Sequence, residues 1–430
     1  MSSLLFVHIA KAGGTSLRRL LKLHEEISRF DCFHNGFLLR FENARCVGRH
    51  RAELNSLEQY DIAVIALRHP VDRLQSCYHY FLSGGLNGRG KGEFLGDLRC
   101  QKYLKSVAPT FSTCTQRLDS ISTRIPHFLP ASYWLDSLAK PIAKSIFCCR
   151  QESFAADVNG LFKALNLPLS RPLEHRNKSA NSTGAILNIS GHDLQCIKHF
   201  YSADFTRFGY ETDFTQSLPL VQYWDQPEPP DLIARRMEVC KSLNPGWDYH
   251  LFNRKTAAGY LKIVYGSDIA SAFLDIRLPA MQADVFRVAF LLHSGGLWVD
   301  AATSLIRPVE TWLDRRHSLQ MLRRSHQEHP KISSGVIYAS RPGLPLLKAA
   351  WEEMVPRLLS RSGAKVYRDF GPGLFRNLMG SSPNIAFGLY AVPEALLEGF
   401  LKLGSSGNIL SSDYHWSKRQ QSESLYFSGE

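Results

Sequence analysis

Short apolar segments alternate with amphipathic ones along the first half of the chain. Three apolar runs are expected to be buried strands, at residues 4–9, 62–67 and 145–149. A segment with helical spacing of apolar residues follows each run, at 16–25, 71–82 and 155–165. Buried strands that alternate with helices are typical of a parallel α/β sheet covered on both faces. The first half therefore predicts such a sheet.

The same alternation resumes in the second half, after a polar stretch that ends in proline at 213–219. The pattern predicts strands at 220–224, 248–252 and 297–300, with helices at 232–243 and 280–293. A chain of 430 residues also exceeds what one hydrophobic core usually holds. We therefore expect two α/β domains, residues 1–216 and residues 217–430.

Composition and charge narrow the classes of function. Hydrophobic residues make up 44% and charged residues 21% of the chain, which is ordinary for a globular protein. The formal net charge of +12 favours anionic partners, such as nucleotides or sulfated sugars. We expect no nucleic-acid partner, because the sequence has no CxxC finger, RNP-like aromatic box or Lys/Arg-rich block.

The compartment is inferred from cysteines and apolar runs. Nine cysteines are scattered between Cys32 and Cys240 in no framework pattern, which is typical of reduced thiols. No signal peptide is recognisable, and no apolar run reaches membrane-spanning length. The expectation is a cytoplasmic protein without a membrane span, with peripheral contact to a membrane face left open.

Residues 6–17 combine features of an anion-binding loop. A strand ends, a loop carries a lysine and two glycines, and two hydroxyl residues open a helix; the residues concerned are Lys11, Gly13, Gly14, Thr15 and Ser16. Glycines let the backbone approach a phosphate, and N–H groups at a helix N-terminus point towards it. The alternative is an ordinary strand–turn–helix with a capping hydroxyl. The loop is not a Walker motif, because the lysine precedes the glycines; this disfavours a P-loop kinase.

A second strand–helix junction lies at residues 65–78. Arg68 follows the predicted strand, at the end where α/β sheets bind ligands. Ser76 lies about two turns into the next helix, on the way to the same crevice. A guanidinium and a hydroxyl suit a phosphate monoester.

The two junctions together resemble the carbohydrate sulfotransferase family over roughly residues 1–213. Residues 8–17 are similar to its 5'-phosphosulfate loop and residues 68–78 to its 3'-phosphate motif, with departures at Ala10, Ala12 and His69. The resemblance implies a P-loop-like parallel-sheet domain that transfers sulfate from 3'-phosphoadenylyl sulfate (PAPS) to a glycan hydroxyl. It also implies that Lys11 acts on the bridging oxygen. Residues 174–179, with Tyr201, Asp204 and Phe208, resemble the closing segment of the family.

Sulfate transfer needs a base for the acceptor proton, and the family uses His or Glu in this role. His50, just before the Arg68 strand, is the first choice, and His34 is the second. The alternative is that each is an ordinary surface or core residue among the 16 histidines.

A second cluster of polar residues lies at 283–300. Asp284 and Arg287 are three apart and share a helix face, and Gly295 and Gly296 end that helix. A short strand then leads to Asp300, where a carboxylate can hold a ribose, a sugar hydroxyl or a divalent cation. The alternative is a salt-bridged helix with a glycine cap and a strand-ending aspartate.

This block resembles glycosyltransferases of the capsular-polysaccharide and mannosyltransferase type, with weaker likeness over about 219–418, including His415 and Trp416. The resemblance implies a Rossmann-like domain of the GT-A type that uses a nucleotide sugar. It implies donor binding by Asp284, Arg287, Gly296 and Asp300, with Asp300 also catalytic. Ala302 stands where the family often has a second aspartate, so Asp300 is expected to bind Mn²⁺ or Mg²⁺ only weakly. Three cations are then considered for the diphosphate, Arg287, Arg254 and Lys418.

The sequence therefore predicts a bifunctional enzyme of polysaccharide biosynthesis, a sulfotransferase joined to a glycosyltransferase. Its expected ligands are PAPS, a nucleotide sugar and a carbohydrate acceptor. The alternative is a sulfotransferase whose second domain binds glycan without catalysis.

Overall fold

The computed structural model divides the chain into two compact units, residues 1–210 and 211–430. It describes residues 2–21, 27–35, 37–42, 45–51, 59–86, 94–136, 143–168, 189–212, 218–324, 332–381, 388–404 and 423–427. The predicted boundary between residues 216 and 217 lies outside these ranges. Each unit is built on a six-stranded sheet of its own.

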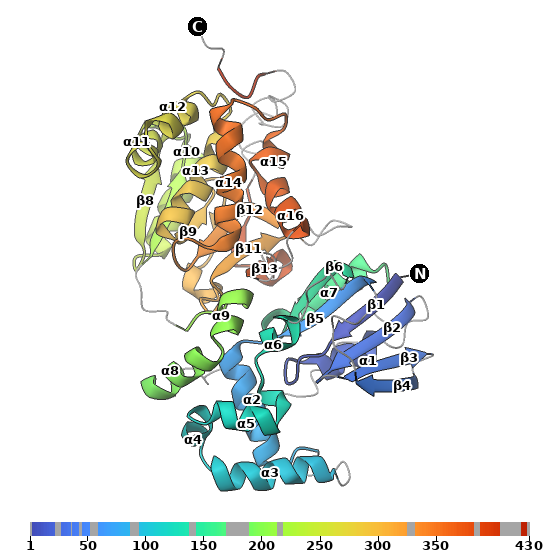
Figure 1. Cartoon of the computed structure of the whole chain (residues 1–430). Helices are drawn as coiled ribbons and strands as arrows, with labels where there is room; N and C mark the ends of the chain where they lie inside the picture. The colour runs from blue at the N-terminus through green and yellow to red at the C-terminus, as the bar shows by residue number, and fades with distance from the viewer. Residues whose placement is uncertain are drawn as a thin grey trace. The chain divides into compact units, whose positions relative to one another are not determined.

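The sheet of the N-terminal unit has the order β4-β3-β2-β1-β5-β6 (Figure 1). Its strands are β1 (Ser2–Val7), β2 (Ile27–His34), β3 (Phe37–Glu42), β4 (Arg45–Arg51), β5 (Tyr60–Leu67) and β6 (Ala143–Arg150). β2, β1, β5 and β6 are parallel, whereas β3 is antiparallel to both neighbours. The expectation of a wholly parallel sheet is therefore corrected to a mixed one. β4 is mostly polar, and the apolar run of β3 is only three residues long, so neither strand has a long apolar signal in the sequence.

The N-terminal unit has nine α-helices among its described residues. They are α1 (Gly14–Leu21), α2 (Pro70–Leu82), α3 (Leu95–Val107), α4 (Phe111–Thr115), α5 (Leu118–Arg124), α6 (Ala131–Asp136), α7 (Phe154–Ala164), α8 (Gly191–Phe200) and α9 (Ser202–Phe208). Figure 1 shows α2 to α5 gathered at one end of the unit. The helices α2, α3, α4, α5 and α8 share a hydrophobic core, which includes Tyr78, Phe81, Leu104 and Ile121. The long segment between β5 and β6 supplies most of these helices. Because β1 and β5 pair in parallel, their carboxyl ends are adjacent.

The sheet of the C-terminal unit has the order β13-β11-β12-β9-β7-β8. Its strands are β7 (Pro219–Tyr223), β8 (Asp248–Phe252), β9 (Gly296–Val299), β11 (Leu319–Arg323), β12 (Ile332–Ala339) and β13 (Leu389–Pro393). β8, β7 and β9 are parallel, and β12 is antiparallel to both β9 and β11. A separate two-stranded pair joins β10 (Ser304–Leu305) to β14 (Leu401–Lys402). The parallel strands again place their carboxyl ends at one edge.

Both faces of this second sheet are buried. Trp298 of β9 contributes to one core, and its neighbours Leu297 and Val299 contribute to the other. This alternation is the two-residue period of a strand between two layers. The helices of the unit are α10 (Asp231–Leu243), α11 (Arg254–Tyr265), α12 (Ser267–Leu274), α13 (Pro279–Ser294), α14 (Pro345–Leu359), α15 (Val366–Asp369) and α16 (Pro372–Ser381).

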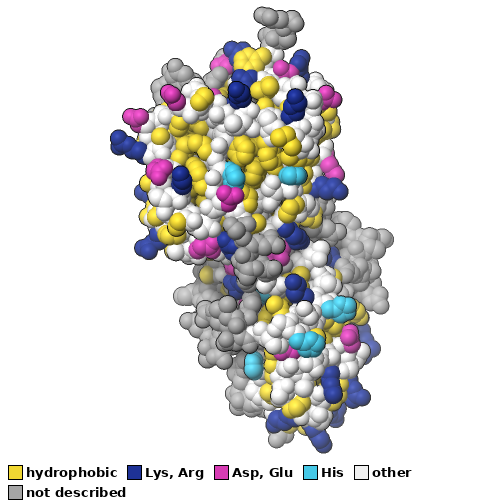
Figure 2. Space-filling view, turned by 90° about the vertical axis from the view of Figure 1, so that its left-hand side faces the viewer, with side chains coloured by type: hydrophobic (Ala, Val, Ile, Leu, Met, Phe, Trp, Pro, Cys, Tyr) yellow, Lys and Arg dark blue, Asp and Glu magenta, His cyan; other side chains and the backbone are white. Residues whose placement is uncertain are grey.

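The cysteines, the helices and the surface can each be compared with the expectations from sequence. All nine cysteines are free thiols, and five of them are buried. Among the described residues, no helix combines the length and apolar character that crossing a bilayer requires. Figure 2 shows one face of the chain; in its upper part hydrophobic side chains gather, with Lys and Arg side chains spread among them rather than collected in one patch.

Candidate active sites

The loop that follows β1 has an unusual backbone. Lys11 and Gly13 have φ angles of 64° and 81°, in the left-handed region. A Cβ at Gly13 would lie 2.1 Å from Oε1 of Gln151, and a Cβ at Gly14 would lie 2.2 Å from Cδ2 of His8. Glycine is favoured at 13 by the left-handed backbone, since the Gln151 side chain could move aside, and at 14 by the closeness of the His8 ring. A lysine held in the left-handed region is the kind of local strain that gathers at ligand sites.

The loop delivers two hydroxyl residues to the start of α1. Thr15 and Ser16 lie in its first turn, whose backbone N–H groups have no partner within the helix. The same end of the helix carries a partial positive charge. The chain thus runs from a strand through a glycine loop into a helix start, and anion binding at this point stays a prediction from the sequence.

Arg68 brings the second predicted motif to this loop. It follows β5, which is the neighbour of β1, and its Nη1 donates to the carbonyl of Lys11 at 3.4 Å. The Lys11 ammonium in turn lies 4.3 Å from the ring centroid of Tyr80 on α2. Ser76 is one turn before Tyr80 and shares its helix face, so this face of α2 borders the loop. The structure thus brings Lys11, Arg68 and the Ser76 face of α2 together.

His34 ends β2 directly beside the loop. Its Nδ1 lies 2.9 Å from the backbone carbonyl of His8, which can only accept, so Nδ1 carries the proton and Nε2 has a free lone pair. Its ring stacks on that of His8, with centroids 4.4 Å apart, and lies 5.6 Å from that of His127. Burial lowers the pKa of His34, and the backbone hydrogen bond opposes this only in part. His34 is therefore a neutral imidazole at pH 7, able to accept a proton at Nε2.

His50 occupies a different place in the sheet. It lies on the edge strand β4. Across the sheet, His50 pairs with Leu38 of β3, Leu38 pairs with Phe33 of β2, and Phe33 pairs with Val7 of β1. The backbone of His50 is therefore three strand spacings, each about 4.8 Å, away from β1. The side chain of His50 lies outside the described part of the structure. The backbone register thus puts His34, and not His50, on the strand next to the loop.

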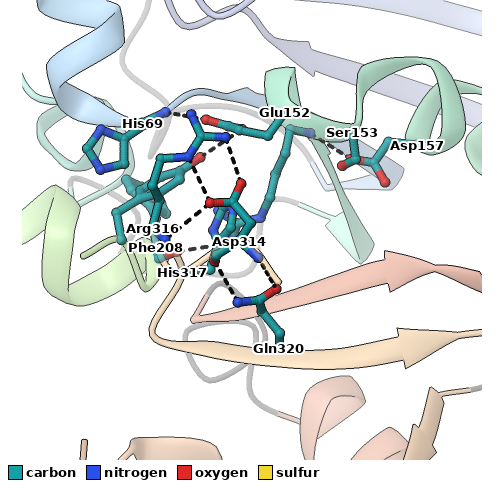
Figure 3. Close-up of polar contacts among 11 residues, drawn as sticks. His69, Glu152, Ser153, Asp157, Phe208, Asp314, Arg316, His317 and Gln320 are labelled. Atoms are coloured by element: carbon teal, nitrogen blue, oxygen red, sulfur yellow. Dashed lines mark hydrogen bonds and ion pairs between the residues drawn. The ribbon is translucent and has the colours of Figure 1, made fainter. Parts of the chain in front are cut away.

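Other residues singled out from the sequence have structural roles. His69 is buried, and its backbone N–H donates to Oε1 of Glu152 at 2.7 Å, as Figure 3 shows. Asp204 accepts the N–H groups of Ala131 and Ser132 at 2.8 and 2.7 Å, which caps the start of α6. The hydroxyl of Tyr201 donates to the Phe128 carbonyl. The predicted segment 174–179 lies outside the described residues.

The second candidate site centres on a buried arginine. Nη1 of Arg287 lies 2.7 Å from Oδ1 of Asp284 within α13, and Nη2 lies 2.8 Å from Oδ1 of Asp300, just past β9. Arg287 also donates to the Ser334 hydroxyl and lies over the ring of Trp298. The local pair that the sequence predicts is thus part of a larger network. Ser334 and Trp298 are members that spacing alone did not indicate.

Asp300 is held through one carboxylate oxygen, and its side chain is partly exposed. Its Oδ1 accepts from both Arg287 Nη2 and Trp298 Nε1, each at 2.8 Å, and 34% of the side chain is exposed. Its Oδ2 faces Gly335, where a Cβ would come within 3.0 Å. Asp300 is therefore oriented by the protein and still able to accept a hydrogen bond from a ligand.

Asp284 lies deeper than Asp300. Burial raises the pKa of Asp284 to about 7; the charge of Arg287 opposes the rise, and that of Asp300 adds to it. Asp284 is consequently part-protonated near neutral pH. Such a group contributes to the shape and charge of the site without direct access to solvent.

Gly296 is explained by packing. It lies at the start of β9, at the opposite end of the strand from Asp300, with φ of 108°. A Cβ there would lie 2.4 Å from the carbonyl oxygen of Pro219. The glycine therefore permits β9 to lie against β7, and this packing role accounts for it without a ligand.

The residues around Asp300 do not fit a tight divalent-cation site. One Asp300 oxygen is already occupied by two donors, and Ala302 supplies no side-chain oxygen. Across the described ranges, no group of three or more His, Cys, Asp or Glu side chains is arranged to hold a metal. Hard cations such as Mg²⁺ and Mn²⁺ need several oxygen ligands. Lys418, His415 and Trp416 lie outside the described residues.

One family model matches a stretch that runs from the last helices of the N-terminal unit into the C-terminal unit. Residues 196–353 match the family model of capsular polysaccharide synthesis proteins. This match contains Asp284, Arg287 and Asp300.

A curated relative and a solved structure were also found. The initiation-specific alpha-1,6-mannosyltransferase of Schizosaccharomyces pombe is 25% identical over 214 residues, covering 43% of this chain and 54% of that protein. The chain thus spans about half the length of this relative. The PaToxG glycosyltransferase structure is 11% identical, covers 47% of this chain and 77% of its own, and has a TM-score of 0.27. The family match and the mannosyltransferase likeness both agree with the glycosyltransferase resemblance that the sequence suggests.

Proposed function

We propose that the C-terminal unit transfers a sugar from a nucleotide sugar to a glycan acceptor, on a Rossmann-like fold of the GT-A type. The observation that carries the proposal is the Arg287 bridge between Asp284 and Asp300, at the carboxyl end of a strand in a three-layer α/β unit. Ligands of α/β sheets bind at this edge. Asp300, whose side chain is partly exposed, accepts a hydrogen bond from a hydroxyl of the donor's sugar or ribose. The likeness to a mannosyltransferase supports a nucleotide sugar as the donor class.

A donor panel tests this proposal. The full chain is incubated with nucleoside-diphosphate sugars, and nucleotide release is measured with and without oligosaccharide acceptors. Asp300→Asn should reduce turnover 100-fold or more, roughly the effect of removing one preorganised group that acts on the transition state. Asp268→Asn, at an exposed aspartate of α12, is the matched control and should keep full turnover. If no donor is bound or consumed, the non-catalytic glycan-binding alternative replaces this proposal.

We further propose that the N-terminal unit is a separate sulfotransferase that uses PAPS. The supporting observation is the Arg68 guanidinium hydrogen bond to the carbonyl of Lys11, which joins the two anion-binding motifs. In this proposal the loop from Lys11 to Ser16 binds the 5'-phosphosulfate, while Arg68 and Ser76 bind the 3'-phosphate. PAPS carries two anionic groups, and the loops after the adjacent strands β1 and β5 each supply a cation, Lys11 and Arg68.

In the proposed reaction a glycan hydroxyl oxygen attacks the sulfur of PAPS. The new O–S bond forms as the bond from sulfur to the phosphate oxygen breaks, and adenosine 3',5'-bisphosphate leaves. Lys11 stabilises the charge that develops on that bridging oxygen. The hydroxyl proton passes to Nε2 of His34, which has a lone pair and a neutral ring. The strand register favours His34 over the first sequence choice, His50, for this role.

Calorimetry with adenosine 3',5'-bisphosphate tests the sulfotransferase proposal. The full chain should bind this nucleotide, and Lys11→Ala should weaken binding at least tenfold through loss of a charge-assisted contact. Lys105→Ala, at an exposed lysine of α3, is the control and should bind as the wild type does. Absence of binding by the wild-type chain would overturn the proposal for this unit and leave that for the C-terminal unit untouched.

A further inference from the structure

The turn after Asp300 has no second carboxylate, but a positively charged arginine from a neighbouring helix reaches it. The turn is closed by a hydrogen bond from the Thr303 N–H to the Asp300 carbonyl at 2.8 Å. Its two alanines, Ala301 and Ala302, are buried against Ile233 and Met237 of α10. α10 therefore lies directly on the corner where a second aspartate would stand.

Arg236 extends from the same face of α10 to this corner. It is three residues after Ile233 and directly before Met237. Its Nη1 donates a hydrogen bond to the carbonyl of Ala302. A Cβ at Gly404 would lie 1.8 Å from that carbonyl oxygen and 2.8 Å from Nη1, so the chain after β14 also reaches this point. Arg236 is half-buried. Within the described part of the chain it makes no ion pair, and its other N–H donors are left for a ligand.

Two further polar groups at this corner have no partner among the described residues. Nε1 of Trp224 and the hydroxyl of Thr303 are both buried without a hydrogen bond. Trp224 follows β7 and packs against the cluster that contains Ala301 and Ala302. β7 is the neighbour of β9, so Trp224 and Asp300 both follow carboxyl ends at one edge of the sheet. Buried donors without partners are costly, and an acceptor-rich ligand would satisfy them.

The other cations considered for this role are engaged or lie outside the described residues. Arg287 is bound by two carboxylates, so its charge is already balanced. Arg254 donates to the Leu274 carbonyl and lies over the ring of Phe427. Lys418 lies outside the described ranges.

We propose that Arg236, together with Nε1 of Trp224, binds the diphosphate of the nucleotide donor in place of a protein-held divalent cation. The proposal rests on the glycosyltransferase function of this unit and adds its donor diphosphate site. A guanidinium matches pairs of phosphate oxygens in two-pronged geometry, and the indole N–H adds a donor. Sugar-nucleotide binding should then depend on Arg236 and only slightly on added metal.

Titration of the full chain with GDP and UDP tests this, each with EDTA and with Mn²⁺. For whichever nucleotide binds, we expect the dissociation constant to differ less than threefold between the two conditions. Arg236→Ala should weaken binding at least tenfold in both, and Arg236→Lys should restore part of the loss. Arg235→Ala, at the exposed neighbouring arginine, is the matched control and should leave binding unchanged.

Ala302→Asp provides the complementary variant. It should make binding stronger in Mn²⁺ than in EDTA by tenfold or more, because two carboxylates then lie at the turn. Equal binding by wild type and Arg236→Ala, or loss of wild-type binding in EDTA, overturns the inference and leaves the glycosyltransferase proposal standing. If neither nucleotide nor any nucleotide sugar binds the wild type, the glycosyltransferase proposal itself fails.

Discussion

Arg287 and Asp300 are 13 residues apart in the chain, yet their side chains meet at 2.8 Å between Nη2 and Oδ1. The helix α13 continues about two turns past Arg287, and the chain then reverses at Gly295, whose φ is 67°. A rise of 1.5 Å per helical residue and about 3.3 Å per strand residue brings the end of β9 back to the level of Arg287. A tight glycine turn is therefore what assembles the carboxylates around the arginine.

Removing this arginine should destabilise the C-terminal unit strongly. Arg287→Ala leaves the carboxylates of Asp284 and Asp300 without their counter-charge, with an expected loss of about 3–5 kcal/mol. Urea unfolding followed by tryptophan fluorescence checks this, because every tryptophan except Trp134 lies after residue 210. Lys348→Ala, which breaks an exposed helical pair with Glu352, should cost less than about 1 kcal/mol. Equal losses for the two variants would contradict the buried bridge.

Asp284 should make stability depend on pH in a defined window. The pKa of Asp284 is raised in the folded state to about 7, from an ordinary value of 3.8, mainly by burial. The protonated form is favoured by folding, so this contribution is complete below pH 4 and is lost as the pH rises to about 7. The stability of wild type relative to Asp284→Asn should fall across this window by up to about 4 kcal/mol, at about 1.36 kcal/mol per pKa unit. A difference that stays flat between pH 4 and pH 8 would contradict the raised pKa.

Gly14 and His8 should be energetically coupled. A methyl group at Gly14 would lie 2.2 Å from the His8 ring, so Gly14→Ala should destabilise the N-terminal unit by about 1–3 kcal/mol. In the His8→Ala background the ring is gone, and the same substitution should cost much less. A double-mutant cycle measured by thermal unfolding gives the coupling directly. Additive losses would show that His8 is not the obstacle.

Arg68 should discriminate between adenosine nucleotides. Arg68→Ala should weaken adenosine 3',5'-bisphosphate at least tenfold and adenosine 5'-phosphate little, because the guanidinium is assigned to the 3'-phosphate. Calorimetric titration of both ligands checks this. Equal losses for both nucleotides would remove the assignment.

The choice of base can be decided with a pair of histidine variants. His34→Ala should lower sulfate transfer by about 10²–10⁴-fold while leaving cofactor affinity nearly intact, because the base acts on the acceptor. His50→Ala, on the edge strand, should retain turnover. The opposite pattern would return the role to His50, the first choice from sequence.

Sequence spacing placed the central elements because their signals are local. The apolar run at 62–67 and the helix at 71–82 correspond to β5 (Tyr60–Leu67) and α2 (Pro70–Leu82). The helix at 280–293 and the strand at 297–300 correspond to α13 and β9, with Asp300 one residue beyond the strand. The pairing of Asp284 with Arg287 follows from helical periodicity alone. These features depend on residues within one or two turns of each other.

Only the tertiary structure decided which distant residues share a site. The sequence could not order β4, β3 and β2 beside β1, so it could not tell that His34 is next to the loop while His50 lies on an edge. Nor could it place Arg236 at Ala302, 66 residues away, since that contact depends on how α10 packs on the turn after β9. Local patterns determine helices, strands and glycine turns, because those are set by neighbouring residues. Strand order and helix packing are set by the burial of whole surfaces against one another, which no short stretch of sequence specifies.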